Sequence, residues 1–474
     1  MDVFGYKYIG RYIQIYTSHE YDISMNTKTM AIIAVAVIVV AAGAAAIMLT
    51  GDDKDDNHSL GFKFNNEVRL AVFGNANGDD YLDKKDVQTL RDLIDGKTEY
   101  DPVMNAYADT NCDGVLDEKD IEHLEKIIAG ESCKMYYWSC AKKIDSIDYP
   151  LSGKIGTHHM YAIDALIILG QYENVVATSD ITFQNSISTD GVRYPGMGTK
   201  IKNVGSPWEN GEAAVKEGVN IWIETGYSAS RDYSTYKTVS DAAGLNLQVI
   251  HLNTTTYNVE TTEIYGSILT LGAMFKALDK AHEYVDWVDG VRKYIDTQSS
   301  NIDKDWTFLT PMGSKGANDI TLDTVHTNGN MMGDVYTISL TGMKSVNTVV
   351  DSGCPAISLE EIYRLDPDVI VIIMFQTSNA SVADIQKQFD AYASVYKETN
   401  AYKNGNVYGV NYYNIASCAG ASELVLLSSY IWPSLFDEKV GWDYLQYYYD
   451  HFTMYDNADV KNMGNAIPFR TSSA

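Results

Sequence analysis

The pattern of apolar and polar positions is clearest in the segment 358–374, SLEEIYRLDPDVIVIIM. Ser358 and Glu361 form a capping box, which marks the start of a short helix with one apolar face. Pro367 ends this helix, because proline lacks a backbone N–H and restricts the residue before it. The unbroken apolar run 369–373 is typical of a strand that helices cover on both faces. The segment therefore predicts a helix, a turn and a buried strand.

The same succession recurs along residues 151–474. The segment 210–224 predicts a helix that stops at Gly218 and then a strand. The pattern predicts further helices over 161–169, 423–432 and 444–452, and further strands over 174–178, 247–252, 306–309 and 407–410. Strands that alternate with helices form mainly parallel sheets. We therefore expect an α/β protein with two Rossmann-like lobes, over residues 151–262 and 298–474.

Between the two lobes, apolar residues keep helical spacing along the whole of residues 263–297. This spacing predicts one long helix that joins the lobes. We expect such a helix to bend at Gly266, Gly272 or Gly290, because glycine is the most flexible residue.

The segment 30–49 carries no charge and is long enough to span a bilayer. Lys28 precedes it and four aspartates follow, so the positive-inside rule places the rest of the chain outside the cell. We expect an uncleaved transmembrane anchor on the extracellular or periplasmic face; a cleaved signal peptide is the alternative. Residues 1–29 would be a short tail, or in part a mis-assigned start, and residues 50–71 a linker.

A twelve-residue loop occurs twice within residues 72–130, each time before an apolar-faced helix. Oxygen-bearing side chains recur at loop positions 1, 3, 5 and 12, and position 7 offers a backbone carbonyl; this is a calcium-binding layout. Gly114 supplies a sharp turn in the second loop, where the first has Asp80, a residue that tolerates the left-handed conformation. We predict two Ca²⁺ sites rather than acidic turns without metal, formed by Asn75, Asn77, Asp79, Tyr81 and Asp86, and by Asp109, Asn111, Asp113, Val115 and Asp120.

This small all-α repeat resembles a type I dockerin, because position 12 is Asp in both copies rather than the Glu of an EF-hand. The resemblance implies a cohesin domain as partner. It also implies that Lys84, Lys85, Glu118 and Lys119 lie near the binding surface. The alternative is a calcium-stabilised spacer between the membrane and the lobes, followed by a linker over residues 131–150.

The segments 204–224, 358–372, 401–410 and 426–436 resemble the class III substrate-binding proteins of ABC transporters for ferric siderophores, haem and cobalamin. The resemblance implies that the lobes close over a metal chelate and deliver it to an ABC transporter permease. It further implies one exposed glutamate on each lobe that pairs with a transporter arginine, a pairing that is bidentate and orienting. The matching positions are Glu212 and Glu360.

Ligands of open α/β sheets bind beyond the carboxyl ends of the strands. Aromatic faces with a few polar groups suit broad macrocycles and catecholate chelates, and Arg231 suits an anionic chelate. Adjacent His158 and His159 either ligate iron or cobalt directly or serve as polar neighbours at a helix start. The predicted ligand-binding residues are Thr157, His158, His159, Trp208, Gly226, Tyr227, Arg231, Met331, Met332, Phe375, Gln376, Tyr412 and Tyr413.

Composition narrows the functional classes further. A net charge of −27 argues against nucleic acid as a partner and suits a protein displayed outside the cell. The five cysteines follow no zinc-binding pattern, and Cys133 and Cys140 are either a disulfide or free thiols. The sequence has no nucleophile elbow, phosphate-binding loop or His-Glu-x-x-His motif, so no enzyme is predicted. The alternative function is a surface adhesion or assembly protein that acts through the dockerin-like repeat.

Overall fold

The computed structural model describes residues 62, 67–140, 142–179, 194, 197–205, 211–225, 244–245, 247–253, 264–313, 324–328, 333–346, 355–375, 381–455 and 458–471. None of the helices formed by these residues has the length and apolar character that a membrane span requires. The predicted anchor over 30–49 lies outside the described residues.

The repeat forms two helices, α3 (Lys84–Ile94) and α4 (Glu118–Ala129). Each begins at an aspartate N-cap, Asp83 or Asp117, that forms a reciprocal capping box with the aspartate at loop position 12. The two helices bury their apolar faces against each other, through residues such as Leu90 and Leu124. The apolar spacing of the sequence therefore predicted both helices correctly.

The segment 131–150 is a hairpin and not the predicted linker. Strands β1 (Cys133–Trp138) and β2 (Ile144–Tyr149) pair in antiparallel fashion, and alternate side chains are buried. Burial of alternate side chains on a core is what stabilises such a hairpin. Ile127 of α4 lies in the same hydrophobic cluster as residues of both strands and of the first lobe. The repeat therefore shares a core with the lobe that follows it.

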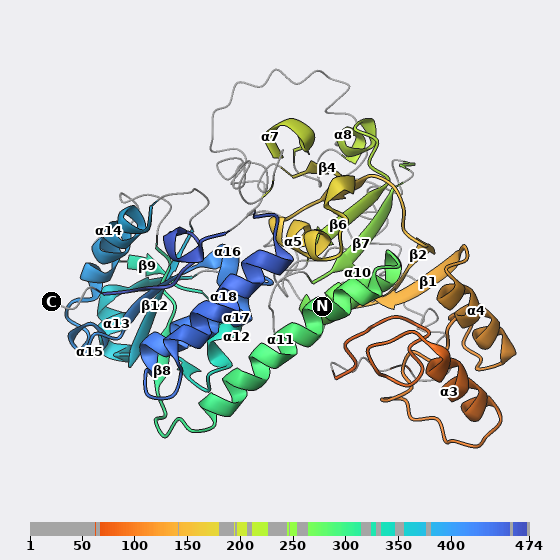
Figure 1. The fold of residues 1–474 in the computed structure, drawn as a ribbon, viewed down its shortest axis with the longest axis horizontal. Coiled ribbons are helices and arrows are strands. Elements are labelled where there is room, and N and C mark those ends of the chain that lie inside the picture. The colour runs from red at the N-terminus through yellow and green to blue at the C-terminus, as the bar shows by residue number, and fades with distance from the viewer. Residues whose placement is uncertain are drawn as a thin grey trace, which may run out of the picture. The chain divides into compact units, whose positions relative to one another are not determined.

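The first lobe contains a five-stranded sheet of order β5-β4-β3-β6-β7, and every neighbouring pair is parallel (Figure 1). The strand order reverses between β3 and β6, which is the topological switch point of this sheet. The strands are β3 (Ile155–Thr157), β4 (Val175–Thr178), β5 (Lys202–Asn203), β6 (Ile221–Thr225) and β7 (Gln248–Leu252), with helical segments α5 (Met160–Ile168), η1 (Tyr172–Asn174), α7 (Met197–Lys200) and α8 (Gly211–Lys216).

The second lobe contains a sheet of order β10-β8-β12-β13-β14, parallel except for the last pair. Its order reverses between β8 and β12. The strands are β8 (Thr307–Leu309), β10 (Lys344–Ser345), β12 (Val369–Met374), β13 (Val407–Asn411) and β14 (Phe469–Arg470), beside a separate antiparallel pair of β9 (Thr324–His326) with β11 (Ala356–Ser358). The helices are α12 (Gly333–Ser339), α13 (Leu359–Leu365), α14 (Val382–Ala393), η3 (Ser394–Tyr396), α15 (Asn400–Lys403), α16 (Tyr412–Ile415), α17 (Gly420–Ile431), α18 (Glu438–Phe452) and η4 (Val460–Asn462).

The segment 358–374 folds as its sequence predicts. Ser358 caps α13 by accepting a hydrogen bond from the backbone N–H of Glu361 at 3.1 Å. The carboxylate of Glu361 pairs with Arg364 and does not return to the cap, so only half of the predicted capping box forms. Asp366 ends the helix in the left-handed conformation, and all residues of β12 are buried.

The predicted interlobe helix is two helices, α10 (Ile264–Met274) and α11 (Leu278–Ser299). The chain breaks around Lys276, whose φ is 56°, and not at a glycine. Gly272 has a different role: a Cβ there would lie 2.7 Å from that of Ala281, so glycine lets the two helices approach. Apolar spacing continues across the break because both helices face one core, which is why the sequence suggested a single rod.

Candidate functional site: strand ends of the two lobes and a repeated acidic loop

The switch point of the first lobe holds a buried histidine and a buried glutamate. His158 follows β3 and Glu224 lies near the carboxyl end of β6; the imidazole Nδ1 contacts a carboxylate oxygen. The side chains of His158 and Glu224 are 5% and 0% exposed. A buried carboxylate requires such a partner, because burial without one is strongly unfavourable.

Further hydrogen bonds hold this pair in place. The indole N–H of Trp222 donates to the second oxygen of Glu224 at 3.0 Å. The backbone N–H of His158 donates to Ile223 at 3.0 Å, and the hydroxyl of Ser179 donates to the His158 carbonyl. The pair is therefore fixed by both strands that border the switch point.

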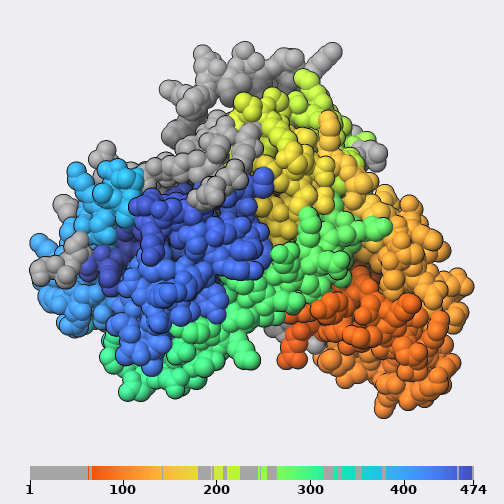
Figure 2. Space-filling model, viewed as in Figure 1, coloured from red at the N-terminus to blue at the C-terminus, as the bar shows by residue number. Residues whose placement is uncertain are grey.

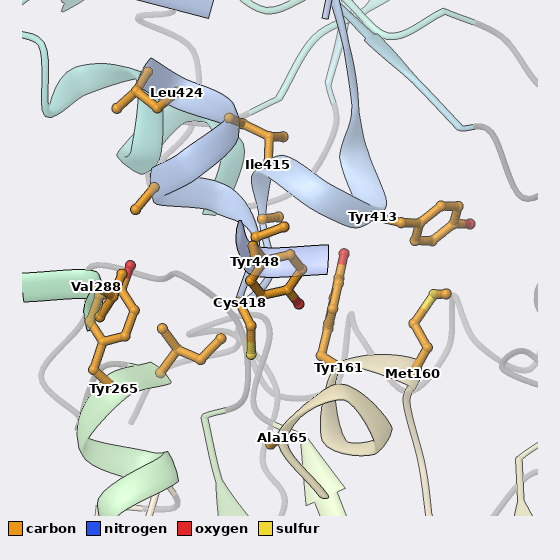
Figure 3. Close-up of a cluster of buried hydrophobic side chains, with 14 of the residues drawn as sticks. Met160, Tyr161, Ala165, Tyr265, Val288, Tyr413, Ile415, Cys418, Leu424 and Tyr448 are labelled. Atoms are coloured by element: carbon orange, nitrogen blue, oxygen red, sulfur yellow. The ribbon is translucent and has the colours of Figure 1, made fainter. Parts of the chain in front are cut away.

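An aromatic series connects the first lobe to the second. The rings of His159 and Tyr161 lie 4.4 Å apart between centroids, and Tyr161 meets Tyr412 of α16 edge to face at 6.3 Å. Phe375, directly after β12, lies 5.2 Å from Tyr412 and 6.0 Å from Tyr413. Figure 3 shows the Tyr161 side chain extending from α5 toward the segment that carries Tyr413. Residues from the strand ends of both lobes thus lie together.

Five of the predicted ligand-binding residues take part in this arrangement: His158, His159, Phe375, Tyr412 and Tyr413. Thr157 is buried within β3, where its hydroxyl is 3.2 Å from that of Thr178. The predicted residues Trp208, Gly226, Tyr227, Arg231, Met331, Met332 and Gln376 lie outside the described residues.

Sequence reasoning missed Glu224 and Tyr161 as members of the site. Glu224 was assigned to the end of a strand and Tyr161 to the start of a helix, and neither was given a role in the site. The signal for Glu224 was a charged residue after the apolar run of β6, because a charge at that place must face a partner across the switch point.

The two glutamates predicted to contact a transporter lie in comparable places. Glu212 and Glu360 are exposed in the first turns of α8 and α13. A helix N-terminus favours a carboxylate in any case. The position of the two glutamates is therefore equally typical of docking residues and of ordinary surface carboxylates.

A surface depression of about 600 Å³ lies elsewhere, along α18 and η4. Its charged residues pair within the depression, as Lys439 does with Asp443 at 2.5 Å, and Lys461 lies over the ring of Trp442. Its lining side chains therefore pair with one another. The depression is separate from the strand ends described above.

Side chains of the second acidic loop hold its backbone in a tight turn through hydrogen bonds. Asp109 accepts hydrogen bonds from the N–H groups of Gly114 at 2.9 Å and Asp113 at 3.2 Å. Gly114 has a φ of 85°, as its predicted role requires. Asp120 is fully buried and accepts from the N–H groups of Asn111 and Asp117. The predicted ligand residues of this loop, among them exposed Val115 with its carbonyl, lie on one tight turn.

The first loop differs at the position where the second has Gly114. Asp80 has no positive φ, so the expected left-handed conformation is wrong; its carboxylate instead binds Arg69. Asn75 is fully buried, and its Oδ1 has no hydrogen-bond partner among the described residues, while its amide N–H groups donate to the backbone carbonyls of Leu70 and Asp79. An unpaired buried oxygen at loop position 1 is what a bound cation would satisfy.

Burial raises the pKa of Asp86 to about 6, and it raises the pKa of Asp120 to about 6 as well. Neighbouring aspartates add to both pKa shifts, and a nearby cation would reverse them. No group of three or more His, Cys, Asp and Glu side chains in the described chain is gathered as a metal site. Each loop mixes carboxylates with amide and backbone oxygens, which is the donor set that Ca²⁺ accepts.

The residues that the dockerin resemblance places near a partner surface are Lys84, Lys85, Glu118 and Lys119, and all four are exposed. Cys133 and Cys140 are not joined by a disulfide in the structure.

No protein-family model matches the chain, and no curated protein resembles it significantly in sequence. Similarity appears in the fold. The chain is similar to the TroA-like periplasmic binding protein FepB from Veillonella parvula, with 15% identity, a TM-score of 0.53, and coverage of 68% of this chain and 97% of that one. A periplasmic solute binding protein from Veillonella parvula gives 16% identity, a TM-score of 0.52, and coverage of 70% and 97%.

A third similar structure is the molybdate periplasmic binding protein MolA of a Haemophilus influenzae ABC transporter, with molybdate bound. It has 14% identity and a TM-score of 0.52, over 67% of this chain and 97% of that chain. At these identities the likeness concerns the fold alone, which is similar to that of periplasmic binding proteins. The predicted α/β architecture of the lobes is confirmed at this level.

Proposed function

We propose that this protein is the substrate-binding component of an ABC importer, displayed on the extracellular or periplasmic face of the membrane and anchored through residues 30–49. It captures a metal chelate, such as a ferric siderophore, haem or a cobalamin, between its lobes and delivers it to the permease. It is not an enzyme. The fold shared with periplasmic binding proteins supports the general class.

The observation that carries the proposal is the aromatic series from His159 through Tyr161 to Tyr412 and Phe375. It joins the strand ends of two separate sheets, which is where open α/β sheets bind ligands. Flat rings with hydroxyl and imidazole groups suit a chelate that has a broad apolar face and a few polar atoms.

The test is a titration of the full-length protein with ferric siderophores, haem and cobalamins, followed by tryptophan fluorescence and melting temperature. Molybdate serves as a separate arm for a small oxyanion. We expect one of the chelates to raise the melting temperature, because a ligand that binds only the folded state stabilises it. Stabilisation by molybdate alone would indicate that the ligand is an oxyanion and not a metal chelate. If none of these compounds changed the fluorescence or the melting temperature, the proposal would be contradicted.

Variants at the strand ends make the test specific. Tyr161→Ala and Tyr412→Ala should each weaken binding of the stabilising chelate by roughly tenfold, since an aromatic contact contributes about 1.5 kcal/mol beyond its buried area. Tyr363→Ala is the matched control, because Tyr363 is 39% exposed on α13. Equal losses in all three variants would show a general effect on folding.

Glu212 and Glu360 serve the transporter and not the ligand in this proposal. The double variant Glu212→Ala, Glu360→Ala should bind the chelate normally and fail to support its uptake by cells that carry the permease. Loss of chelate binding in the double variant would contradict the docking role.

We also propose that the two acidic loops bind Ca²⁺. Asn75, Asn77, Asp79, Asp86 and the Tyr81 carbonyl would hold one ion, and the equivalent residues Asp109 to Asp120 the other. The ions would neutralise the buried carboxylates and tie each loop to the helix that follows it. The unpaired Oδ1 of Asn75 supports this site.

Removal of calcium tests both loops at once. Chelation by EDTA at neutral pH should lower the melting temperature of the full-length protein by several degrees, because two ions that bind the folded state are lost. Asp79→Asn together with Asp113→Asn should abolish this response, and an unchanged response would show that the loops are not metal sites.

A second candidate function uses the repeat itself. The exposure of Lys84, Lys85, Glu118 and Lys119 leaves room for a cohesin-like partner, and the protein would then be a surface assembly component. Calcium-dependent capture of a purified cohesin domain, lost when these four residues are replaced by alanine, would favour this function over import.

A further inference from the structure

The first acidic loop makes a set of contacts that the second loop lacks. Arg69, which lies before the loop, binds the Asp80 carboxylate and also donates from Nη1 to both carboxylate oxygens of Asp289, at 2.8 Å each. Asp289 belongs to α11, the helix that leads from the first lobe to the second. One guanidinium therefore links the loop to the connecting helix. In Figure 2 the red-orange surface of the repeat lies against the green surface of this helix.

A histidine of α11 contacts the loop directly. His282 Nε2 is 2.9 Å from the backbone carbonyl of Asp80. The ring of Tyr81 stacks on the imidazole of His282, with 4.0 Å between centroids and 9° between planes. His282 is only 8% exposed, so this contact is a packed interface and not a chance surface encounter.

The two copies of the loop differ at the positions that make this interface. Asp80 and Tyr81 occupy loop positions 6 and 7, where the second copy has Gly114 and Val115. Val115 is 54% exposed, and Tyr81 is itself 43% exposed although its ring stacks on His282. Both loops keep the same oxygen positions for a cation. The first loop differs in having Asp80 and Tyr81, which contact α11.

Loop position 7 connects the cation to the interface. The proposed first calcium site uses the Tyr81 backbone carbonyl, and the ring of the same residue stacks on His282. The unpaired Oδ1 of buried Asn75 points independently to a cation in this loop. A cation that fixes the Tyr81 carbonyl also restricts the ring that stacks on His282 of α11, and the stacked ring in turn restricts the carbonyl.

We infer that the first loop is a calcium-dependent brace on the interlobe helix, so that Ca²⁺ binding and the packing of α11 stabilise each other. The inference rests on the proposed calcium site and adds a partner for it within the same chain, namely the start of α11. Energetic coupling of this kind is reciprocal: whatever α11 adds to calcium affinity, calcium adds to the packing of α11.

The first test measures calcium affinity by calorimetry in the full-length chain, with the second loop disabled by Asp113→Asn and Asp120→Asn. In this background, His282→Ala should weaken Ca²⁺ binding by about fivefold, the lower end of typical coupling between sites. Asp289→Asn is a milder second variant, since Asp289 is 42% exposed. Glu283→Ala, exposed on the same helix, is the matched control and should leave affinity unchanged.

The second test uses hydrogen exchange of residues 278–292, a readout that does not depend on ligand or transport. Ca²⁺ should slow exchange in this part of α11 in the background protein and leave it unchanged once His282→Ala is introduced. If the variant with the disabled second loop fails to fold, His282→Ala is compared with the unaltered protein instead. The calcium titrations are then fitted with two sites.

The brace would be overturned if all variants bound Ca²⁺ with equal affinity and if Ca²⁺ did not change the hydrogen-exchange rate of α11. The calcium site itself would remain. Complete absence of Ca²⁺ binding to the first loop would overturn the proposed site and the brace together. The two failures are thus distinguishable.

Discussion

The two lobes share a plan of construction but carry different chemistry at their strand ends. Each has a five-stranded sheet whose order reverses once, between β3 and β6 in the first lobe and between β8 and β12 in the second. At the first reversal lies the buried pair of His158 and Glu224, whereas Phe375 follows the second and packs on tyrosines of α16. The fold fixes where the strand ends lie, and the side chains of each lobe decide which chemical groups are found there.

The buried carboxylates of the two lobes show the same contrast. Glu224 of the first lobe faces an imidazole and an indole N–H. Asp334 of the second lobe, also fully buried, accepts a hydrogen bond from the neutral amide of Asn328 at 2.9 Å. Burial raises the pKa of Asp334 to about 6. A carboxylate with a basic partner stabilises the fold, while one without it costs stability when ionised.

The largest expected effect concerns the first-lobe pair. Glu224→Ala should lower the free energy of unfolding by about 3 kcal/mol, because it leaves His158 and the Trp222 N–H buried without their acceptor. Urea unfolding at neutral pH and fixed calcium measures the change. Glu217→Ala, exposed in the same lobe, is the control, and equal stability of both variants would show that the pair is dispensable.

A second effect tests how alike the two sheets are. A Cβ at Gly156 of β3 would lie 2.5 Å from the Trp222 ring, and one at Gly409 of β13 would lie 2.6 Å from the Phe389 ring. Gly156→Ala and Gly409→Ala should each cost about 2 kcal/mol of stability through overpacking.

Gly290→Ala on α11 is the matched control for these glycines, since its Cβ would meet no atom within 4 Å. It should stabilise the protein by about 0.5 kcal/mol through helix propensity. Unfolding curves that show a loss in one sheet only would mean that one lobe relaxes around an added methyl group and the other does not.

The third effect is a gain in stability that depends on pH. Asp334→Asn should raise stability by about 1 kcal/mol at pH 7.5, because it removes the cost of a buried charge. The folded-state pKa of Asp334 is raised above its ordinary value, so the cost grows as pH rises toward about 6 and stays above it.

Thermal unfolding from pH 4 to 8 measures this difference. The advantage of Asp334→Asn should be full well above pH 6 and shrink as pH falls toward 4, because the folded-state carboxyl, with a pKa of about 6, is then protonated and the unfolded-state carboxyl, with a pKa of 3.8, begins to be. An advantage that is the same at every pH would mean that the charge of Asp334 is not its cause.

Local sequence was sufficient for elements whose signals are short-range. Ser358 and Pro367 mark the ends of α13, and the apolar run after them is β12, as predicted. The repeated loops likewise located α3 and α4, which follow them, although the aspartate caps were seen only in the structure. Caps, breakers and periodicity act within a few residues, so they can be read along the chain.

Contacts between distant segments decided the rest. The hairpin over 133–149 was taken for a linker because its burial depends on a core shared with Ile127 and the first lobe. The break at Lys276 left no mark in the apolar spacing, and the conformation of Asp80 depends on Arg69 and the helix beyond it.

The sequence by itself therefore determined the order and type of most elements, the α/β class, and which strand ends carry polar and aromatic residues. Only the tertiary structure decided that Glu224 meets His158, that Tyr161 meets Tyr412, and that the first acidic loop rests on α11. The physical reason is that capping and periodicity are set by neighbours in sequence, whereas the partner of a buried charge or ring is set by how sheets and helices pack.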